Sequence, residues 1–146
     1  MHLSVYFHLQ YICHIKLYCV FQLRNETIKL ADLGLTKPEH EISGTKCSSA
    51  YYTAPEVLEG HEYGKPADIF SLGLIVWELW YGRLAQQELA SSQQGEVDTA
   101  IRKGIRPSLV TVHEPPESLR NQIKSCWHQS PKQRPTAEDC CNYFST

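Results

Sequence analysis

The sequence contains no run of basic residues, no internal repeat and no long uncharged hydrophobic stretch. Its 14 lysines and arginines are spread along the chain, and the formal net charge is −2. Binding to nucleic acid by counterion release needs clustered cations. We therefore expect no nucleic-acid partner for this protein.

The cysteines lack the spacing of a metal site. Of the six cysteines, none forms a Cys-x-x-Cys pair with a histidine partner at metal-ligand spacing. Cys140 and Cys141 are adjacent, which does not suit a compact disulfide framework. Reduced thiols in a cytoplasmic protein are the expected state.

Residues 1–23 are rich in apolar side chains, but polar ones recur too often for a membrane anchor. Every window approaching the length of a membrane-spanning helix is interrupted by one of His8, Gln10, His14, Lys16 and Gln22. No small-residue cleavage site of a signal peptide follows. The residue types favour a strand or irregular core, so membrane association is not expected.

The rest of the chain predicts one mainly helical globular domain. The whole sequence of 146 residues is 42% apolar and 21% charged, which is enough for a single hydrophobic core. Residues 67–82 are apolar on nearly every side and predict a helix buried at the centre of the domain. Residues 27–34 predict a short strand, whereas the polar residues 84–96 predict a loop.

Other segments carry the start and stop signals of shorter helices. Residues 54–60 and 96–104 each end in a glycine that would stop a helix. The segment 115–129 begins with two prolines and spaces its apolar residues along one helical face: Leu119, Ile123, Cys126 and Trp127. Thr136, followed three residues later by Asp139, predicts a capping box at the start of a last helix.

Four motifs then occur in one order along the chain. Asp-Leu-Gly at 32–34 follows a strand, Ala-Pro-Glu at 54–56 closes a hydroxyl-rich loop, Asp68 opens the central helix, and Cys126-Trp127 precedes Arg134-Pro135. Each is weak alone, but the ordered set resembles the C-terminal lobe of a protein kinase. The resemblance covers about 25–146 and implies a helical bundle around one buried helix, with a short β element near Asp-Leu-Gly. Residues 1–24 do not share it and are expected to be a separate segment.

Two further stretches favour one branch of that family. "YTAPE" and "GIRP", together with the Cys-Trp and Arg-Pro pairs, are more similar to the tyrosine-kinase and tyrosine-kinase-like branches than to other serine/threonine kinases. The opening "KLADLGLTKPE" is similar to the dual serine/threonine and tyrosine kinases. The resemblance implies protein substrates or protein partners.

The resemblance also implies a nucleotide and metal site. Asp32 stands where kinases have the aspartate that binds the metal bridging the nucleotide phosphates, and Gly34 permits the backbone turn beside it. ATP and Mg²⁺ are therefore the implied cofactors, with Asp32 as metal ligand and Asp32 and Gly34 as cofactor-binding residues. Taken alone, an aspartate after a strand is equally well explained as a turn residue.

Four more matching residues are expected to be structural. Glu56 and Arg134 match two residues that pair in kinases, and in a buried pair the loss of one partner costs about 3–5 kcal/mol. Asp68 matches the aspartate that opens the central helix and anchors the catalytic loop, although the helix dipole favours an acid there in any case. Trp127 completes this structural set.

By the same resemblance, residues 32–56 form the activation segment. The candidate phosphate acceptors are Thr36, Ser43, Thr45, Ser48, Ser49, Tyr51 and Tyr52. A phosphate on one of them would order the loop if an arginine cluster faced it. The alternative is that these hydroxyls belong to an ordinary solvated loop.

The catalytic residues of the family have no counterparts in this sequence. Ungapped alignment puts His14 where the catalytic aspartate belongs and Cys19 where the metal-binding asparagine belongs. His14 has a different geometry for accepting a substrate proton, and Cys19 is a soft ligand unsuited to magnesium. No Gly-x-Gly-x-x-Gly loop and no Val-Ala-Ile-Lys strand occur. No residue is assigned a catalytic role, and the chain by itself is expected to be inactive.

Three interpretations follow from these departures. The chain is a truncated form of an ATP-dependent kinase, with residues 1 to about 22 foreign to it. Alternatively, it is a pseudokinase-like binding module that docks proteins through the activation segment and residues 85–104. The third interpretation is that it folds poorly, because a lobe without its partner leaves apolar surface open.

Overall fold

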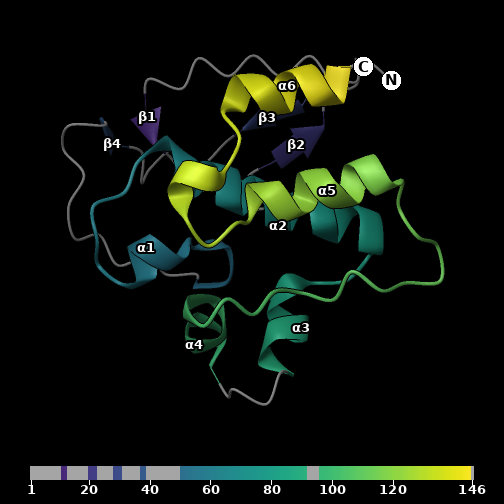
Figure 1. The fold of residues 1–146 in the computed structure, drawn as a ribbon, viewed down its shortest axis with the longest axis horizontal. Coiled ribbons are helices and arrows are strands. Elements are labelled where there is room, and N and C mark those ends of the chain that lie inside the picture. The colour runs from purple at the N-terminus through teal and green to yellow at the C-terminus, as the bar shows by residue number, and fades with distance from the viewer. Residues whose placement is uncertain are drawn as a thin grey trace.

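The structure is a computed structural model. It describes the backbone at residues 11–12, 20–22, 28–30, 37–38 and 50, and both backbone and side chains over 51–91 and 96–145. In these residues the architecture is mainly helical, as the sequence predicts, with a central helix surrounded by shorter ones (Figure 1). No helix among the described residues is both long and apolar enough to cross a membrane.

Two short antiparallel ladders account for the described strands. β1 (Tyr11–Ile12) pairs with β4 (Lys37–Pro38), and β2 (Val20–Gln22) pairs with β3 (Ile28–Leu30). β3 lies within the predicted strand 27–34, so the expected β element next to Asp-Leu-Gly is confirmed. Its β-branched and apolar residues suit a paired strand.

A short helical segment precedes the central helix. The 3₁₀ turn η4 (Ala50–Tyr52) leads into α1 (Pro55–Leu58). Pro55 lies in the first turn of α1, where the backbone N–H that proline lacks would have no partner within the helix. Gly60 adopts φ 75°, a left-handed conformation that ends the segment at the predicted glycine. The helix predicted over 54–60 is confirmed.

The central helix α2 (Lys65–Tyr81) begins two residues before the predicted 67 and ends before Gly82, whose φ is 62°. Most of it is buried, as predicted, but Leu79 and Trp80 are 67% and 46% exposed. These two side chains are exposed because the last turn of α2 directs only one of its faces toward the core. Trp77 and Tyr81, four residues apart, stack inward with ring centroids 5.2 Å apart, while positions 79 and 80 lie on other faces of the helix.

The predicted loop over 84–96 is wrong in part, because Ala85–Ala90 form a helix, α3. Its mostly polar sequence contains two apolar residues, Ala85 and Leu89, which are four positions apart and so lie on one face of a helix. Ala85 and Leu89 are 0% and 1% exposed and belong to the main core, so tertiary packing stabilises a segment with weak local signals. The next helix, α4 (Val97–Arg102), is confirmed where the sequence predicts it.

The last helices follow their sequence signals. α5 (Glu117–Cys126) starts after Pro116 and buries Ile123, Cys126 and the following Trp127. The 3₁₀ turn η5 (Pro131–Gln133) leads to α6 (Ala137–Ser145). The predicted capping box is confirmed: the Asp139 N–H donates to Thr136 Oγ1 at 3.1 Å, and the Thr136 N–H donates to Asp139 Oδ2 at 2.8 Å.

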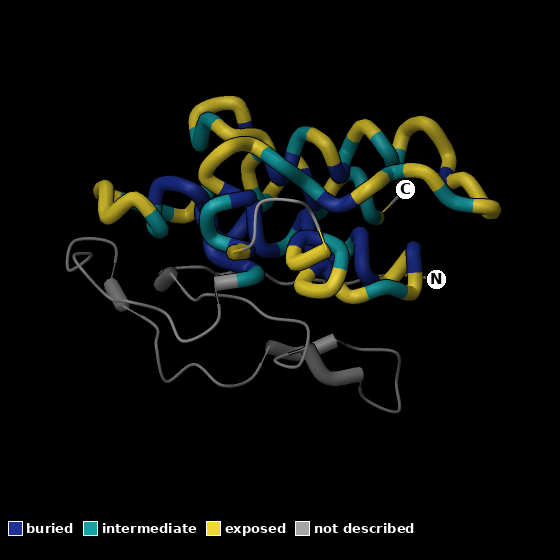
Figure 2. Tube along the Cα trace, turned by 90° about the horizontal axis from the view of Figure 1, so that it is seen from below, coloured by how far each residue is buried: buried dark blue, intermediate teal, exposed yellow. Residues whose placement is uncertain are grey.

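The core is formed where α2 meets the surrounding helices. Phe70, Leu74 and Trp77 of α2 are fully buried, and Ile101 of α4 and Ile123 of α5 close the core from two sides. Figure 2 shows the buried residues gathered inside and the exposed ones on the outer sides of the helices.

Helices α2 and α5 cross at Gly73. A Cβ atom there would lie 2.8 Å from the Cβ of Cys126, closer than real Cβ atoms approach. The missing side chain of Gly73 therefore permits the close contact between the two helices.

Candidate functional site

A buried ion pair joins the end of the expected activation segment to the C-terminal part of the chain. Arg134 donates from Nη1 to Glu56 Oε1 at 2.7 Å and from Nη2 to Glu56 Oε2 at 2.8 Å. The two side chains are 0% and 9% exposed, respectively. This parallel, two-bond geometry is the strongest form of an arginine–carboxylate contact, so the structure brings together the two residues that the sequence expects to pair.

The remaining donors of Arg134 bind backbone carbonyls from two segments. Nε donates to the His128 carbonyl at 2.8 Å, Nη1 to the Pro66 carbonyl at 2.9 Å and Nη2 to the Gln129 carbonyl at 3.3 Å. All the guanidinium nitrogens thus have acceptors, which a buried charge requires. One side chain connects α1, the first turn of α2 and the turn after α5.

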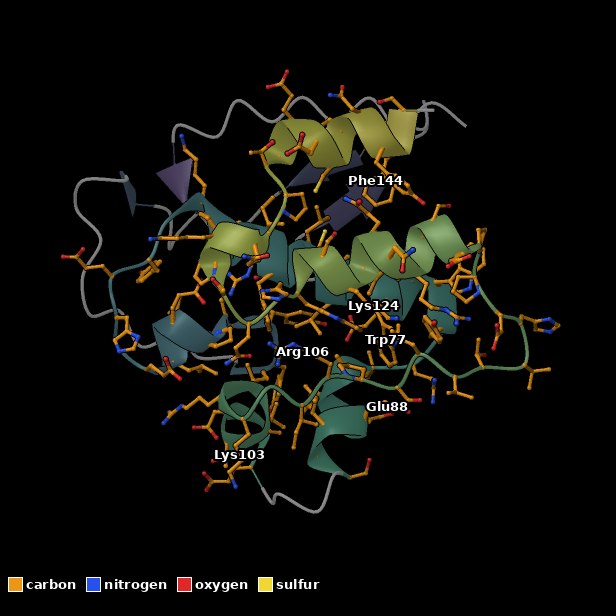
Figure 3. All side chains as sticks on the ribbon, viewed as in Figure 1. Trp77, Glu88, Lys103, Arg106, Lys124 and Phe144 are labelled. Carbon is orange, nitrogen blue, oxygen red and sulfur yellow. The ribbon has the colours of Figure 1, made fainter. Side chains whose placement is uncertain are left out.

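A second arginine lies on the same aromatic ring. The guanidinium carbons of Arg106 and Arg134 lie 4.8 and 5.1 Å from the ring centroid of Phe70. Figure 3 shows Arg106 near the middle of the helical bundle. Burial, and then the charge of Arg134, lower the pKa of Arg106 to about 10, while Glu56 opposes that shift.

Arg106 is anchored by carbonyl and amide oxygens. Nε donates to the Trp127 carbonyl at 3.0 Å, and Nη1 donates to the Ile105 carbonyl at 2.8 Å. Nη2 donates to Gln129 Oε1 at 2.7 Å. The sequence marked this residue only as part of "GIRP", and no local signal indicated that it shares a ring with Arg134.

The residues just before α1 are fixed to the central helix through Glu78. The hydroxyl of Tyr52 donates to Glu78 Oε2 at 2.7 Å, and the Ala85 N–H donates to Glu78 Oε1 at 2.8 Å. Ser71 Oγ also donates to the Tyr52 carbonyl, at 2.7 Å. Glu78 is 4% exposed, and a buried acid needs hydrogen-bond partners. We did not predict this role from the sequence. The available signal was an acidic residue inside an otherwise apolar helix.

The sequence model of the family described as "Protein kinase domain" matches residues 4–144. This span includes nearly all of the 146 residues. The chain belongs to the protein kinase family. The match begins inside residues 1–24, which the motifs alone set apart from the kinase-like part, so that boundary stays a prediction.

Curated kinases align with most of this chain. It is 34% identical over 118 residues to "Probable serine/threonine-protein kinase drkB" of Dictyostelium discoideum, covering 80% of this chain and 16% of that protein. It is 32% identical over 136 residues to "Dual serine/threonine and tyrosine protein kinase" of Danio rerio, covering 89% and 15%. It is 30% identical over 122 residues to "Mitogen-activated protein kinase kinase kinase mom-4" of Caenorhabditis briggsae, covering 84% and 22%. The chain thus spans less than a quarter of each of these kinases.

The candidate phosphate acceptors of the expected activation segment divide into two groups. Thr36, Ser43, Thr45, Ser48 and Ser49 lie outside the described residues. Tyr51 is partly exposed, whereas Tyr52 is 9% exposed and its hydroxyl already donates to Glu78. Of the two tyrosines, Tyr51 presents the more accessible side chain.

The residues expected to bind nucleotide and metal, Asp32 and Gly34, lie outside the described residues. So do His14 and Cys19, which the ungapped alignment puts at the positions of the catalytic aspartate and the metal-binding asparagine. Within the described part of the chain, no group of three or more histidine, cysteine, aspartate or glutamate side chains could hold a metal ion. Asp68 is 1% exposed in the first turn of α2, and Trp127 is 5% exposed after α5. These two residues have the buried setting expected of structural positions.

Proposed function

We propose that these residues supply the C-terminal lobe of an ATP-dependent protein kinase and do not catalyse phosphoryl transfer by themselves. The observation that carries this proposal is the buried Glu56–Arg134 pair, which fixes the end of the activation segment onto the helical core. Such an anchor serves a kinase because catalysis of phosphoryl transfer depends mainly on holding the reacting groups in place.

A second anchor supports the same proposal. Tyr52 is fixed from both sides, because its hydroxyl binds Glu78 and its carbonyl accepts from Ser71. These two bonds hold Tyr52 against α2, just before the segment that contains Glu56.

The inactivity of the 146 residues rests on the chemistry of two positions. A base and a second magnesium ligand are needed, and the aligned residues are His14 and Cys19. The thiol of Cys19 is a poor ligand for magnesium, which prefers oxygen. With only Asp32 left as an oxygen ligand, the donor set does not fit a nucleotide-bound metal, and we assign no chemical step to it.

A phosphoryl-transfer assay tests the proposal. The purified 146-residue chain is incubated with radiolabelled ATP and Mg²⁺, with dephosphorylated casein as a general protein acceptor. We expect no more incorporation than in a reaction with the Asp32→Asn variant. Incorporation that requires Asp32 would overturn the proposal.

A pseudokinase-like binding module is a second candidate. It is favoured by the retention of the Glu56–Arg134 and Tyr52–Glu78 contacts beside the replaced His14 and Cys19. The test measures binding of candidate proteins to the folded, monomeric native chain. A protein that binds it with a measurable Kd, and no longer binds after the chain is unfolded in urea, supports this candidate; the absence of any partner for the folded chain argues against it.

A further inference from the structure

Two buried thiols lie side by side where α6 packs on α5. The Sγ atoms of Cys126, at the end of α5, and Cys140, in α6, are 3.8 Å apart. The two residues are 2% and 1% exposed, and both are free cysteines. Their separation exceeds the disulfide length of about 2.05 Å by less than one atomic diameter. The two sulfurs are therefore close enough to react with each other after a small movement.

The chemical setting of the two sulfurs is unequal. The Gln122 side-chain amide donates to Cys140 Sγ at 3.5 Å and to Cys126 Sγ at 3.8 Å. The hydrogen bond between the thiols lowers the pKa of Cys140, against the opposing effect of burial. For Cys126, the same bond and burial both raise the pKa. The bond between the thiols thus favours ionisation at Cys140 over Cys126, and the thiolate is the reactive form of cysteine.

The two cysteines are held by different contacts. Cys126 is held by the close crossing of α2 and α5, where its Cβ faces Gly73. Cys140 belongs to a helix whose buried contacts form a small cluster separate from the main core, consisting of Ile69, Cys126 and Cys140 with Leu72, Ala137 and Phe144. Figure 3 shows Phe144 pointing from α6 toward α5. Local opening of α6 would expose both thiols to a small oxidant.

We propose that Cys126 and Cys140 are a redox modification site, forming an intramolecular disulfide when the chain meets a peroxide. In the first step the Cys140 sulfur attacks one peroxide oxygen and the O–O bond breaks. The other oxygen departs as water, and Cys140 becomes a sulfenic acid. In the second step the Cys126 sulfur attacks that sulfenic sulfur, and the hydroxyl group leaves as water. The two thiols lose two electrons and two protons in total, and hydrogen peroxide is reduced to two waters.

The disulfide would tie α6 covalently to α5. It closes the loop between residues 126 and 140, which carries Trp127 and Arg134. Closing a loop of this length restricts the unfolded chain and stabilises the native state. Oxidation would therefore hold the Arg134 segment and α6 together, and reduction would release α6 again.

Peptide mapping of the full 146-residue chain tests the proposal. The reduced protein is treated with a limiting amount of hydrogen peroxide, free thiols are blocked, and a tryptic digest is read by non-reducing mass spectrometry. Trypsin places Cys126 in the peptide 125–132, and Cys140 and Cys141 in the peptide 133–146. We expect these two peptides to be joined, with a loss of two hydrogens, before any other cysteine is oxidised.

Two single variants and a denatured control identify the bond. The link should persist in Cys141→Ser and disappear in Cys140→Ser, and 6 M guanidinium chloride should abolish the preference for this pair. The oxidised native chain should unfold on the order of 5 °C higher than the reduced chain, a difference removed by dithiothreitol. The proposal is overturned by a Cys140–Cys141 bond, a bond from Cys126 to another cysteine, or oxidation of Cys141 alone.

Discussion

Arg134 and Glu56 are 78 residues apart in the sequence and share two parallel hydrogen bonds of 2.7 and 2.8 Å in the interior. The arginine also donates hydrogen bonds to the backbone carbonyls of Pro66, His128 and Gln129. This contact connects the end of the expected activation segment to both the central helix and the turn after α5.

Removing one partner of this pair should be costly. Arg134→Met leaves the Glu56 carboxylate buried without its cation, and we expect a loss of about 3–5 kcal/mol in the free energy of unfolding. The matched control is Arg102→Met, which breaks the exposed Arg102–Asp98 pair at 3.2 Å and should cost less than about 1 kcal/mol. Urea denaturation monitored by tryptophan fluorescence measures both, and equal losses would show that the buried pair has no special role.

The Tyr52 hydroxyl should matter for a different reason. In Tyr52→Phe, Glu78 keeps only the Ala85 N–H as a bonding partner among the contacts described above, and the carboxylate loses its shortest bond. We expect a loss of about 1–3 kcal/mol. Tyr143→Phe removes an exposed hydroxyl bonded to Ser118 at 3.2 Å and should change the free energy of unfolding by less than about 0.5 kcal/mol. If the two variants lose equal stability in the same urea titration, the anchoring role of Glu78 is wrong.

The contact between α2 and α5 makes a steric prediction. A methyl group in Gly73→Ala would lie 2.8 Å from the Cys126 Cβ, so the two helices must separate. We expect a loss on the order of 1–3 kcal/mol, even though alanine favours helix more than glycine does. Asn121→Ala, on the exposed side of α5, serves as a control and should change the free energy of unfolding by less than about 0.5 kcal/mol. A stabilised Gly73→Ala variant would mean that the crossing is looser than described.

The cap of α6 predicts a pH dependence. Hydrogen bonds from the hydroxyl and the N–H of Thr136 lower the pKa of Asp139 below its ordinary value of 3.8. A lowered folded-state pKa adds stability that is present above pH 3.8 and lost as the pH falls through the folded value. The native chain should therefore be more stable than Asp139→Asn at pH 7, and the difference should shrink below about pH 4. Thermal unfolding from pH 7 to 3 measures it, and a difference that stays constant over this range would contradict the contact.

Much of the fold could be predicted because its signals are local. The apolar run of α2, the glycine at 60 and the Thr136–Asp139 box each indicate an element from neighbouring residues alone. Helix α3 could not be predicted in this way, since its stability comes from Ala85 and Leu89 packing into a core that other segments build.

In the candidate site too, some contacts could be predicted from the sequence and others could not. The pairing of Glu56 with Arg134 followed from motifs whose order implies a family. The partners of Glu78 join residues that no sequence spacing brings together, and so does the contact of Arg106 with the same Phe70 ring as Arg134. Contacts of this kind depend on the final packing of α2 against its neighbours.

The most direct test of the account is the thermal unfolding of the 146-residue chain with and without millimolar Mg²⁺ and ATP. We predict one cooperative transition, because the Glu56–Arg134 and Tyr52–Glu78 contacts connect distant segments of the lobe. We also predict no change in Tm when the nucleotide is added. A ligand that binds only the folded state must raise Tm. A Tm that rises with Mg²⁺–ATP concentration and fails to rise in Asp32→Asn would contradict the account.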